Sequence, residues 1–418
     1  MNEWEENYIT VSSNIKKIFN DPVYGFISFP FDNLYRVIDS FEFQRLRRIS
    51  QMGFSLLVYP GAVHTRFHHS LGAVHLMSRA LYHLQSIGID ISVEEANAAC
   101  MAVLCHDIGH GPYSHALERE IVNKNHEELS LEIMQRLRNE MPEESAVFDS
   151  AIDIFLGIHP KKFLHQLVSS QLDMDRLDYL TRDSFFTGVV EGAVGYDRII
   201  HMLNINDNTL VVEEKGLYSV EKFLMARRTM YWQVYLHKTA LVAEKMLLKA
   251  IQRCKLLLSQ GEPVRGTDSF LFLMESTPNS DCNEQLILSH FLQLDDTDII
   301  HFLKANMDHP DRILSILCSG IISRKLFKVK LSDQMPEVGH IFYIREAVRN
   351  KYGASDDDLE YLVYLGEEGN QSYNAERDSI LIKLKDGGIK SVSAMSSFFT
   401  TGERSSKYYL CYPKDVSA

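Results

Sequence analysis

The sequence lacks paired cysteines. Its 418 residues include six cysteines, and no two of them form a Cys-x-x-Cys pair. Disulfide frameworks are typical of short secreted chains, and zinc sites built from cysteine depend on such closely spaced pairs. We therefore expect neither a disulfide-rich scaffold nor a cysteine-based zinc site.

Long apolar runs are also absent. The most apolar window, residues 96–105, is ten residues long and includes Asn97. A helix that spans a bilayer needs about 20 apolar residues in succession. The N-terminus is acidic and is not followed by an apolar run, so no signal peptide is expected. We expect a soluble, cytoplasmic protein that does not insert into a membrane.

An excess of positive charge is missing as well, because the net charge is −13. Affinity for nucleic acid depends on basic side chains that neutralise phosphates, so we expect no general binding of nucleic acid. The charge is still compatible with a local basic pocket for a small phosphorylated ligand.

The hydrophobic pattern predicts a mainly α protein. Hydrophobic residues make up 45% and charged residues 24%, as in globular chains, and the length indicates two or three structural units. Helical spacing of apolar residues follows a short hairpin predicted at residues 15–30. The predicted helices cover residues 33–51, 71–88, 92–105, 126–139, 162–182, 218–259, 284–292 and 296–306.

Beyond about residue 320, apolar and polar residues alternate with period two, which is typical of strands. The turn Asp386-Gly387-Gly388 indicates a hairpin. We therefore predict a helical domain at residues 1–320 and a smaller C-terminal α+β unit at residues 321–418. The predicted strand segments are residues 325–331, 359–365, 379–384 and 408–412.

Histidine is concentrated in one part of the chain. Nine of the 17 histidines lie within residues 64–126, which indicates a metal or acid/base site or, as the alternative, a chance cluster on solvated helix faces. The pattern that favours a metal site consists of His69, His106, Asp107 and Asp175. Two imidazoles and two carboxylates suit Mn, Fe, Ni or Zn, and Mg less well.

Three segments resemble the motifs of one enzyme family. They are residues 60–72, PGAVHTRFHHSLG; residues 104–115, LCHDIGHGPYSH; and residues 173–183, DMDRLDYLTRD. In this order they resemble the HD-domain deoxynucleoside triphosphate (dNTP) triphosphohydrolases. The resemblance covers most of the chain and implies an HD-domain helical core at about residues 60–185.

The resemblance implies roles for individual side chains. His69, His106, Asp107 and Asp175 match the metal ligands of the family. The positions that match catalytic residues are His110, His115, Glu118 and His126. Among these, His115 would protonate the leaving 5′-oxygen, and Glu118, where the family usually has aspartate, would orient it.

Eight further positions match residues that bind the substrate. Arginines would hold the phosphates, and the remaining residues would hold phosphate and the deoxyribose. These positions are Gln51, Met52, Arg66, Arg176, Tyr179, Asp183, Arg227 and Tyr235. Two of them differ from the usual pattern: Arg176 replaces a lysine, and Met52 replaces a leucine.

A regulatory site is a further implication of the resemblance. Its candidate residues match positions that bind an activating guanine nucleotide, and a polar surface between subunits is the alternative interpretation. These residues are Lys17, Asn20, Asp39, Gln44, Arg47 and Arg198. Glu213 lies where an arginine would be expected. A homodimer or homotetramer is expected.

The resemblance thus implies a metal-dependent enzyme that hydrolyses dNTPs to deoxynucleoside and tripolyphosphate. The metal would be Mn, Fe, Ni or Zn, with Mg on the triphosphate as a further candidate cofactor. Two alternatives stay open: a phosphohydrolase for another nucleotide or a phosphomonoester, and a nucleotide-sensing oligomer with little turnover. The Gly-Tyr-Pro motif of HD cyclic-dinucleotide phosphodiesterases is absent.

Overall fold

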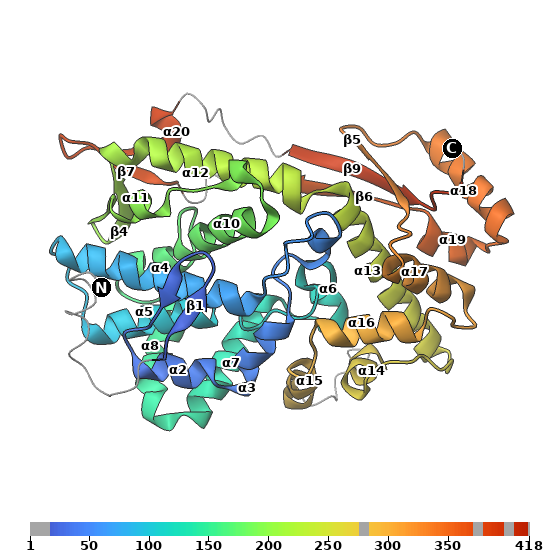
Figure 1. Cartoon of the computed structure of the whole chain (residues 1–418), viewed down its shortest axis with the longest axis horizontal. Helices are drawn as coiled ribbons and strands as arrows, with labels where there is room; N and C mark the ends of the chain where they lie inside the picture. Colours follow the sequence, from blue (N-terminus) through green and yellow to red (C-terminus); the bar gives the residue numbers. More distant parts are fainter. Residues whose placement is uncertain (1–16, 276–283, 371–378, 397–404, 417–418) are drawn as a thin grey trace.

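The computed structural model describes residues 17–275, 284–370, 379–396 and 405–416. Helices dominate this part of the chain, and three small sheets lie among them (Figure 1). The predicted mainly α fold is therefore confirmed. Within the described residues, no helix is both long enough and apolar enough to cross a bilayer.

The helices fall into two successive groups along the chain. The earlier helices are α2 (Asp32–Ile38), α3 (Phe41–Gln44), α4 (Arg66–Ser86), α5 (Val93–Cys105), α6 (Ser114–Ile121), α7 (His126–Glu140), α8 (Ser145–Phe155), α9 (Lys162–Val168), α10 (Met174–Thr187), α11 (Tyr196–Ile200), α12 (Leu217–Met230) and α13 (Lys238–Ser259). The later helices are α14 (Asp268–Glu275), α15 (Glu284–Phe291), α16 (Asp296–Ala305), α17 (Arg312–Ile322), α18 (Val338–Tyr352), α19 (Asp356–Leu362) and α20 (Val392–Met395).

Helix α5 lies at the centre of the first core. The Ser92 hydroxyl accepts a hydrogen bond from the Glu95 main-chain N–H at 3.2 Å, and the Glu95 carboxylate accepts one from the Ser92 N–H at 2.8 Å. This reciprocal capping box begins the helix as predicted. After its exposed first turn, the helix packs against α4 and α8 and is buried from Ala96 to Cys105 except at Asn97. Its C-terminal end therefore delivers the next two residues into the interior.

Two predicted helices, residues 33–51 and 162–182, are wrong as single elements. Ser40 caps the start of α3 by accepting a hydrogen bond from the Phe43 N–H at 3.3 Å. Asp173 likewise begins α10, because its carboxylate accepts hydrogen bonds from the main-chain N–H groups of Ser170 and Arg176, both at 2.7 Å. Side chains that bind main-chain N–H groups favour a new helix start over continuation.

The predicted helix at residues 218–259 is interrupted as well. The π-helical turn η6 (Tyr231–Tyr235) separates α12 from α13, and the Leu236 N–H donates to the Tyr231 carbonyl at 2.9 Å. A bond across five residues widens the helix by one residue per turn. Helix α13 begins after His237, whose ring Nδ1 accepts a hydrogen bond from the Thr239 N–H at 3.2 Å.

The strands form three sheets. Strands β1 (Phe19–Asp21) and β2 (Gly25–Ile27) make the predicted hairpin. A four-stranded sheet has the order β3 (Leu203–Asn206), β4 (Thr209–Glu213), β7 (Leu381–Lys383) and β8 (Ile389–Ser391), with β4 and β7 parallel. A three-stranded antiparallel sheet has the order β5 (Lys328–Ser332), β9 (Ser405–Tyr412) and β6 (Tyr364–Asn370).

The C-terminal segments therefore contribute strands to the four-stranded sheet and to the three-stranded sheet. Strands lie within or across the predicted segments 325–331, 379–384 and 408–412, and β7 and β8 flank the predicted turn. Most of segment 359–365 is instead helix α19, which a capping box between Ser355 and Asp358 begins. The division of the chain at residue 320 stays a prediction.

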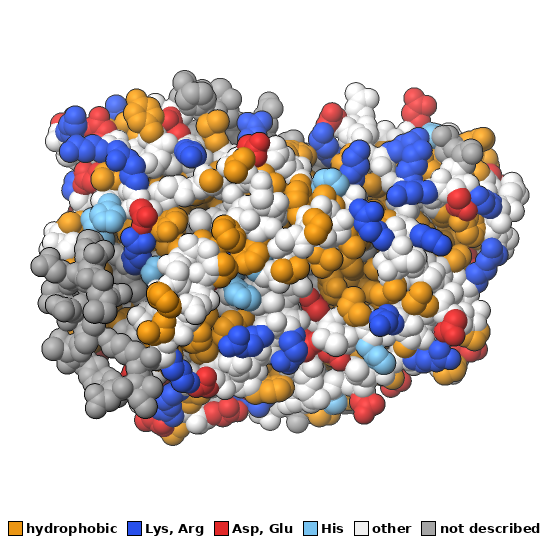
Figure 2. Space-filling view, in the orientation of Figure 1, with side chains coloured by type: hydrophobic (Ala, Val, Ile, Leu, Met, Phe, Trp, Pro, Cys, Tyr) orange, Lys and Arg blue, Asp and Glu red, His pale blue; other side chains and the backbone are white. Residues whose placement is uncertain are grey.

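Two clusters of buried side chains make up the core. The first includes α4, α5, α8, α10 and α12, and the second includes α13, α17 and the three-stranded sheet. The two clusters meet around the short 3-10 helix η2 (Gly53–Leu57), since Met52 belongs to the first and Phe54 to the second. On the face shown in Figure 2, Lys and Arg side chains form small groups separated by apolar and acidic ones.

Gly72 allows α4 and α10 to approach closely. A Cβ atom at this position would lie 1.9 Å from Asp178 Oδ1 and 2.2 Å from Arg182 Nη2. Both partners are fully buried, so they have little room to move. The contact between the two helices therefore requires glycine here.

We predict that Gly72→Ala lowers the free energy of unfolding by about 1–3 kcal/mol, the usual cost of overpacking a core. Urea denaturation followed by circular dichroism measures this change. Gly195→Ala is the matched control, because a Cβ at this exposed glycine meets no atom within 4 Å. Equal denaturation midpoints for the two variants would contradict this account of the α4–α10 contact.

Candidate metal and substrate site

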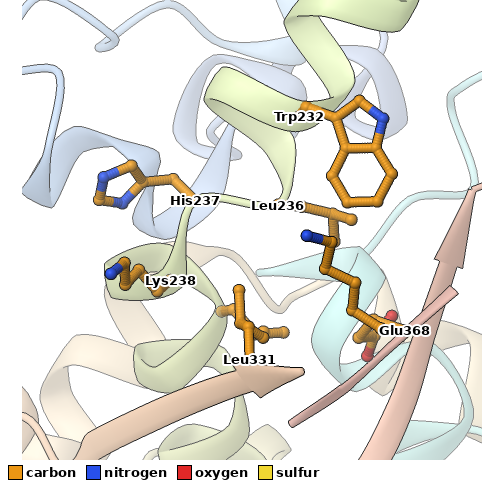
Figure 3. Close-up of a pocket in the computed structure, with 8 residues that line it drawn as sticks. Trp232, Leu236, His237, Lys238, Leu331 and Glu368 are labelled. Atoms are coloured by element: carbon orange, nitrogen blue, oxygen red, sulfur yellow. The ribbon is translucent and has the colours of Figure 1, made fainter. Parts of the chain in front are cut away.

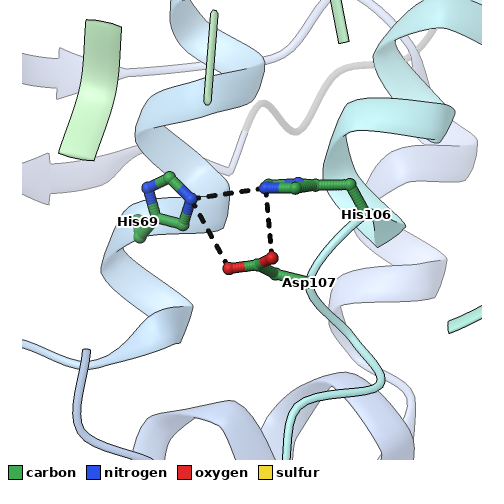
Figure 4. Close-up of side chains that lie close together, drawn as sticks. All are labelled: His69, His106 and Asp107. Atoms are coloured by element: carbon green, nitrogen blue, oxygen red, sulfur yellow. Dashed lines mark hydrogen bonds and ion pairs between the residues drawn. The ribbon is translucent and has the colours of Figure 1, made fainter. Parts of the chain in front are cut away.

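The four predicted metal ligands converge at one point between three helices. His69 comes from α4, His106 and Asp107 follow the end of α5, and Asp175 lies in the first turn of α10. The Nε2 atoms of His69 and His106 are 3.4 Å apart. Asp175 Oδ1 is 3.1 Å from His69 Nε2 and 3.5 Å from His106 Nε2. Asp107 Oδ1 is 3.4 Å from His106 Nε2, and Oδ2 is 3.7 Å from His69 Nε2 (Figure 4).

The second nitrogen of each imidazole is engaged elsewhere. His69 Nδ1 lies 2.8 Å from Asp178 Oδ2, and His106 Nδ1 lies 2.6 Å from the carbonyl oxygen of Val103. An acceptor at Nδ1 favours the tautomer that carries its proton there, which leaves the Nε2 lone pair for a metal. Both rings are thus oriented for ligation, and His69, His106 and Asp107 are close enough together to hold a cation.

The electrostatics of the cluster also fit a cation. Burial lowers the pKa of His69, but hydrogen bonds to Asp175 and Asp178 outweigh it and raise the pKa to about 10. Burial acts in the opposite direction on Asp175 and raises its pKa, but hydrogen bonds to His106 and His69 outweigh burial, so the pKa of Asp175 is lowered overall. The carboxylates therefore create a strongly negative potential at the point where the four side chains meet, and this potential favours positive charge there.

A second group of side chains surrounds Asp107 on its other side. Arg66 Nη1 donates to Asp107 Oδ2 at 2.5 Å, and His110 Nε2 lies 3.2 Å from Asp107 Oδ1. The rings of His110 and His126 stack with centroids 4.1 Å apart. Asp107, His110 and His126 are close enough together to hold a cation of their own.

Glu118 contacts His126. Its carboxylate accepts a hydrogen bond from the His126 main-chain N–H at 2.6 Å and also contacts the His126 ring at Nδ1. His115 lies in α6, but its side chain is outside the described part of the structure. The predicted partnership of Glu118 with His115 therefore stays a prediction.

These side chains open into a pocket of about 600 Å³. Its lining spans both cores: Asp107 follows the end of α5, Arg66 and Asp175 belong to α4 and α10, and further lining residues belong to α13. The predicted site residues among its lining are Gln51, Met52, Arg66, Asp107, His110, His126, Asp175, Tyr179, Asp183, Arg227 and Tyr235. Arg176 is not part of the lining; it forms an ion pair with Asp173, and its pKa is raised chiefly by that charge.

Asp183 and Gln51 present polar atoms to the pocket. Asp183 accepts a hydrogen bond from the Tyr235 hydroxyl at 2.6 Å on one oxygen, and His64 Nε2 lies 2.7 Å from the other. Gln51 Oε1 is buried and has no hydrogen-bond partner among the described residues. A buried acceptor without a partner costs free energy, which a donor on a bound ligand could relieve.

Comparisons with known proteins place this geometry in a family. A family model described as HD domain matches residues 66–183, and one described as HD associated region matches residues 194–264. The crystal structure of a phosphohydrolase from Bacteroides thetaiotaomicron VPI-5482 is 46% identical, with a TM-score of 0.89, over 95% of this chain and 100% of that one. The chain belongs to the HD-domain phosphohydrolase family.

Two further relatives are similar to most of this HD-domain chain. The uncharacterized protein YwfO of Bacillus subtilis (strain 168) is 31% identical over 424 residues, which cover 96% of this chain and 93% of that protein. The deoxynucleoside triphosphate triphosphohydrolase SAMHD1 of Gallus gallus is 26% identical over 395 residues. That match covers 84% of this chain and 61% of the chicken protein.

The HD-domain site includes buried side chains to which the sequence analysis assigned no role. Asp178 accepts from Arg182 Nε at 3.0 Å while it contacts His69, and Arg182 Nη1 donates to Asp21 at 2.7 Å. Asp178 and Arg182 lie four residues apart within the third motif, a spacing that places them on one face of a helix. The spacing alone predicts that Asp178 and Arg182 can contact each other. It does not reveal that α4 covers this face of α10 and brings His69 to Asp178.

Most residues of the predicted regulatory site lie in the N-terminal part of the chain, whereas Arg198 lies apart from them in the sequence. Lys17 pairs with Asp39, Gln44 Nε2 donates to the Ile38 carbonyl at 2.7 Å, and Arg47 Nε donates to Gln44 at 2.9 Å. Two further candidates lie in other elements, Asn20 in β1 and Arg198 in α11. The guanine-nucleotide site stays a prediction.

We predict that Asp178→Asn weakens divalent-metal binding by about 10- to 100-fold, because a neutral amide holds the His69 ring less firmly than a carboxylate does. Metal titration of the purified variant, with the metal content measured by mass spectrometry, tests this expectation. Asp149→Asn is the matched control, since Asp149 forms an exposed pair with Arg138. Unchanged metal affinity in Asp178→Asn would rule out the proposed positioning role.

Proposed function

We propose that the protein hydrolyses deoxynucleoside triphosphates to a deoxynucleoside and tripolyphosphate. The observation that carries this proposal is the shared pocket, which is lined by the candidate metal ligands Asp107 and Asp175, by cationic side chains and by candidate sugar-binding groups. Two relatives, the chicken protein and a homologue of it from Dictyostelium discoideum, bear the name deoxynucleoside triphosphate triphosphohydrolase, which supports it.

The proposed cofactor is a divalent transition metal, namely Mn, Fe, Ni or Zn, with Mg on the triphosphate as a further candidate. His69, His106, Asp107 and Asp175 would hold the transition metal, because their nitrogen and oxygen donors suit these ions. When bound, such a metal supplies Lewis-acid activation of the phosphate ester and of water. Asp178 and Val103 would keep the histidine donors directed toward it.

The phosphates would be held by cations along the pocket. Arg66 is pre-oriented by Asp107, and Arg227 Nη1 donates to Gln171 at 2.9 Å, so both guanidinium groups are already positioned. Arginine binds phosphate oxygens through two parallel hydrogen bonds and neutralises charge that grows in the transition state. Arg176 would join them only if it released Asp173.

Proton transfer would be the task of the histidines. His115 is proposed to protonate the leaving 5′-oxygen, and Glu118 to support the acid group. The stacked pair His110 and His126 would face the α-phosphate. Burial lowers the pKa of His110 well below its usual value, and the Arg66 charge lowers it further, so His110 would act as a neutral ring.

The deoxyribose would lie against Tyr235, with Asp183 and Gln51 at the 3′-hydroxyl. Gln51 Oε1 offers a free acceptor, and Asp183 is held in place by Tyr235 and His64. The proposal also includes a cytoplasmic homodimer or homotetramer and an activating guanine nucleotide at Lys17, Asn20, Asp39, Gln44, Arg47 and Arg198.

We predict that bond cleavage occurs at the α-phosphorus. Hydrolysis of a dNTP in ¹⁸O-water should place the label in tripolyphosphate, because attack at phosphorus leaves the new oxygen there. Chromatography and mass spectrometry of the products distinguish this outcome. Label in the deoxynucleoside would indicate attack at carbon, and release of monophosphate with dNDP would refute triphosphohydrolase activity.

We predict a preference for deoxyribonucleotides that depends on Tyr235. A 2′-hydroxyl would meet the aromatic ring without a partner, and a buried unpaired hydroxyl costs about 1–3 kcal/mol, or roughly a 10- to 100-fold loss of kcat/KM. Tyr235→Ala should lower the ratio of kcat/KM for dGTP to kcat/KM for GTP. Tyr235→Phe, which keeps the ring and loses the hydrogen bond to Asp183, should preserve the ratio. Equal kcat/KM for GTP and dGTP in the wild type would refute the proposed sugar contact.

A further inference from the structure

One wall of the pocket is a face of helix α13. Leu241, Glu244, Lys245 and Leu248 line the pocket from this face. Leu241 and Leu248 are seven residues apart, which corresponds to about 10 Å along a helix. This length is comparable to that of a nucleobase, and Tyr235, at the proposed sugar position, lines the same pocket.

One charged group of this wall is already neutralised. Lys245 forms an ion pair with Glu368 of β6. Glu368 also lines an adjoining pocket of about 380 Å³, shown in Figure 3, which shares Leu236 and Leu241 with the larger one. Among the described residues, Lys245 thus forms its ion pair with Glu368 and not with the neighbouring Glu244.

The Glu244 carboxyl group has no such partner. No hydrogen bond or ion pair is formed by its side chain within the described residues. Desolvation raises the pKa of Glu244 to about 7; Lys245 acts to lower it, and Glu368 to raise it. The Glu244 side chain is half-buried. An unpaired carboxyl group that loses part of its hydration costs free energy, so its presence in a ligand-sized pocket points to a polar ligand opposite it.

We propose that Glu244 reads the base of the substrate and selects guanine, so that dGTP is the preferred dNTP. This inference rests on the proposed function. The Watson–Crick edge of guanine presents two adjacent donors, N1–H and the N2 amino group, and the two oxygens of a carboxylate accept both. Leu241 and Leu248, three residues before and four after Glu244, would contact the faces of the ring.

The other bases fit this carboxylate less well. Adenine and cytosine each present one donor beside a ring-nitrogen acceptor, which faces a carboxylate oxygen unfavourably. Thymine presents a single donor between two carbonyl groups. A site built to accept hydrogen bonds from a substrate discriminates strongly against analogues that lack the donors.

The decisive experiment compares kcat/KM for dGTP, dITP and dATP at pH 8, where Glu244 is ionised, in the wild type and in Glu244→Gln. The wild type should prefer dGTP to dATP by at least about tenfold, with dITP between them, because dITP lacks the N2 donor. A glutamine amide presents one acceptor and one donor, the arrangement that pairs with adenine. Glu244→Gln should therefore reduce the dGTP to dATP ratio by about 10- to 100-fold.

Two further variants separate base reading from a structural effect. Glu244→Asp retains the charge one methylene farther from the ligand, so it should preserve the order of the bases with lower kcat/KM. Glu262→Gln makes the same chemical change at an exposed carboxylate just beyond the end of α13 and should leave the ratio unchanged.

Equal kcat/KM for all four dNTPs in the wild type, or an unchanged ratio in Glu244→Gln, would overturn this inference while dNTP hydrolysis itself still stood. Absence of dNTP turnover would instead overturn the proposed function. In that case, equilibrium binding of dGTP and dATP to the metal-loaded protein decides the matter for Glu244. Tighter binding of dGTP that is lost in Glu244→Gln would support base reading, and equal affinities would overturn it.

Discussion

The carboxylate of Asp178 is the contact on which the site depends. It joins the imidazole of His69 on α4 to the guanidinium of Arg182 on α10, and Gly72 leaves the space that it occupies. Arg182 in turn reaches Asp21 at the end of β1. A buried chain of alternating charges is stable only when every member is paired, so these elements must assemble together.

The position of α5 adds the second half of the candidate metal site. Its apolar sequence requires full burial, and its end therefore places His106 and Asp107 inside the protein beside His69. Burial of the apolar side chains of α5 thus provides the free energy that keeps His106 and Asp107 away from water. The negative potential of the cluster is a consequence of this burial, since the same carboxylates on a surface would be screened by solvent.

Much of this arrangement could be predicted from the sequence, for reasons that are local. The capping box at Ser92 and Glu95 and the apolar run after it define α5, and the three motifs contain the candidate ligand residues. The break at Asp173 was missed because it results from a side chain binding main-chain N–H groups, which competes with apolar periodicity. Periodicity records only the apolar positions, so it continued through the break.

The role of Asp178 and the wall at Glu244 could not be predicted, because each depends on contacts between distant segments. Asp178 meets a residue 109 positions earlier in the chain, and Lys245 meets one 123 positions later. No local pattern encodes which polar group will be opposite another after folding. The side chains that complete a site are consequently harder to identify than those that carry its motif.

The π-helical turn at Tyr231–Tyr235 has a consequence for how the pocket can vary among related chains. A π turn holds one residue more than an α-helical turn, so loss of a single residue would convert it into regular helix. The wide turn takes up the extra residue within itself, so the helix on either side would keep its direction after the loss. The loss would therefore alter the side chains presented by Tyr231–Tyr235 while Arg227, about two turns before Tyr235, kept its place. The end of the pocket at Tyr235 can therefore change through the loss of a single residue while the end at Arg227 is retained.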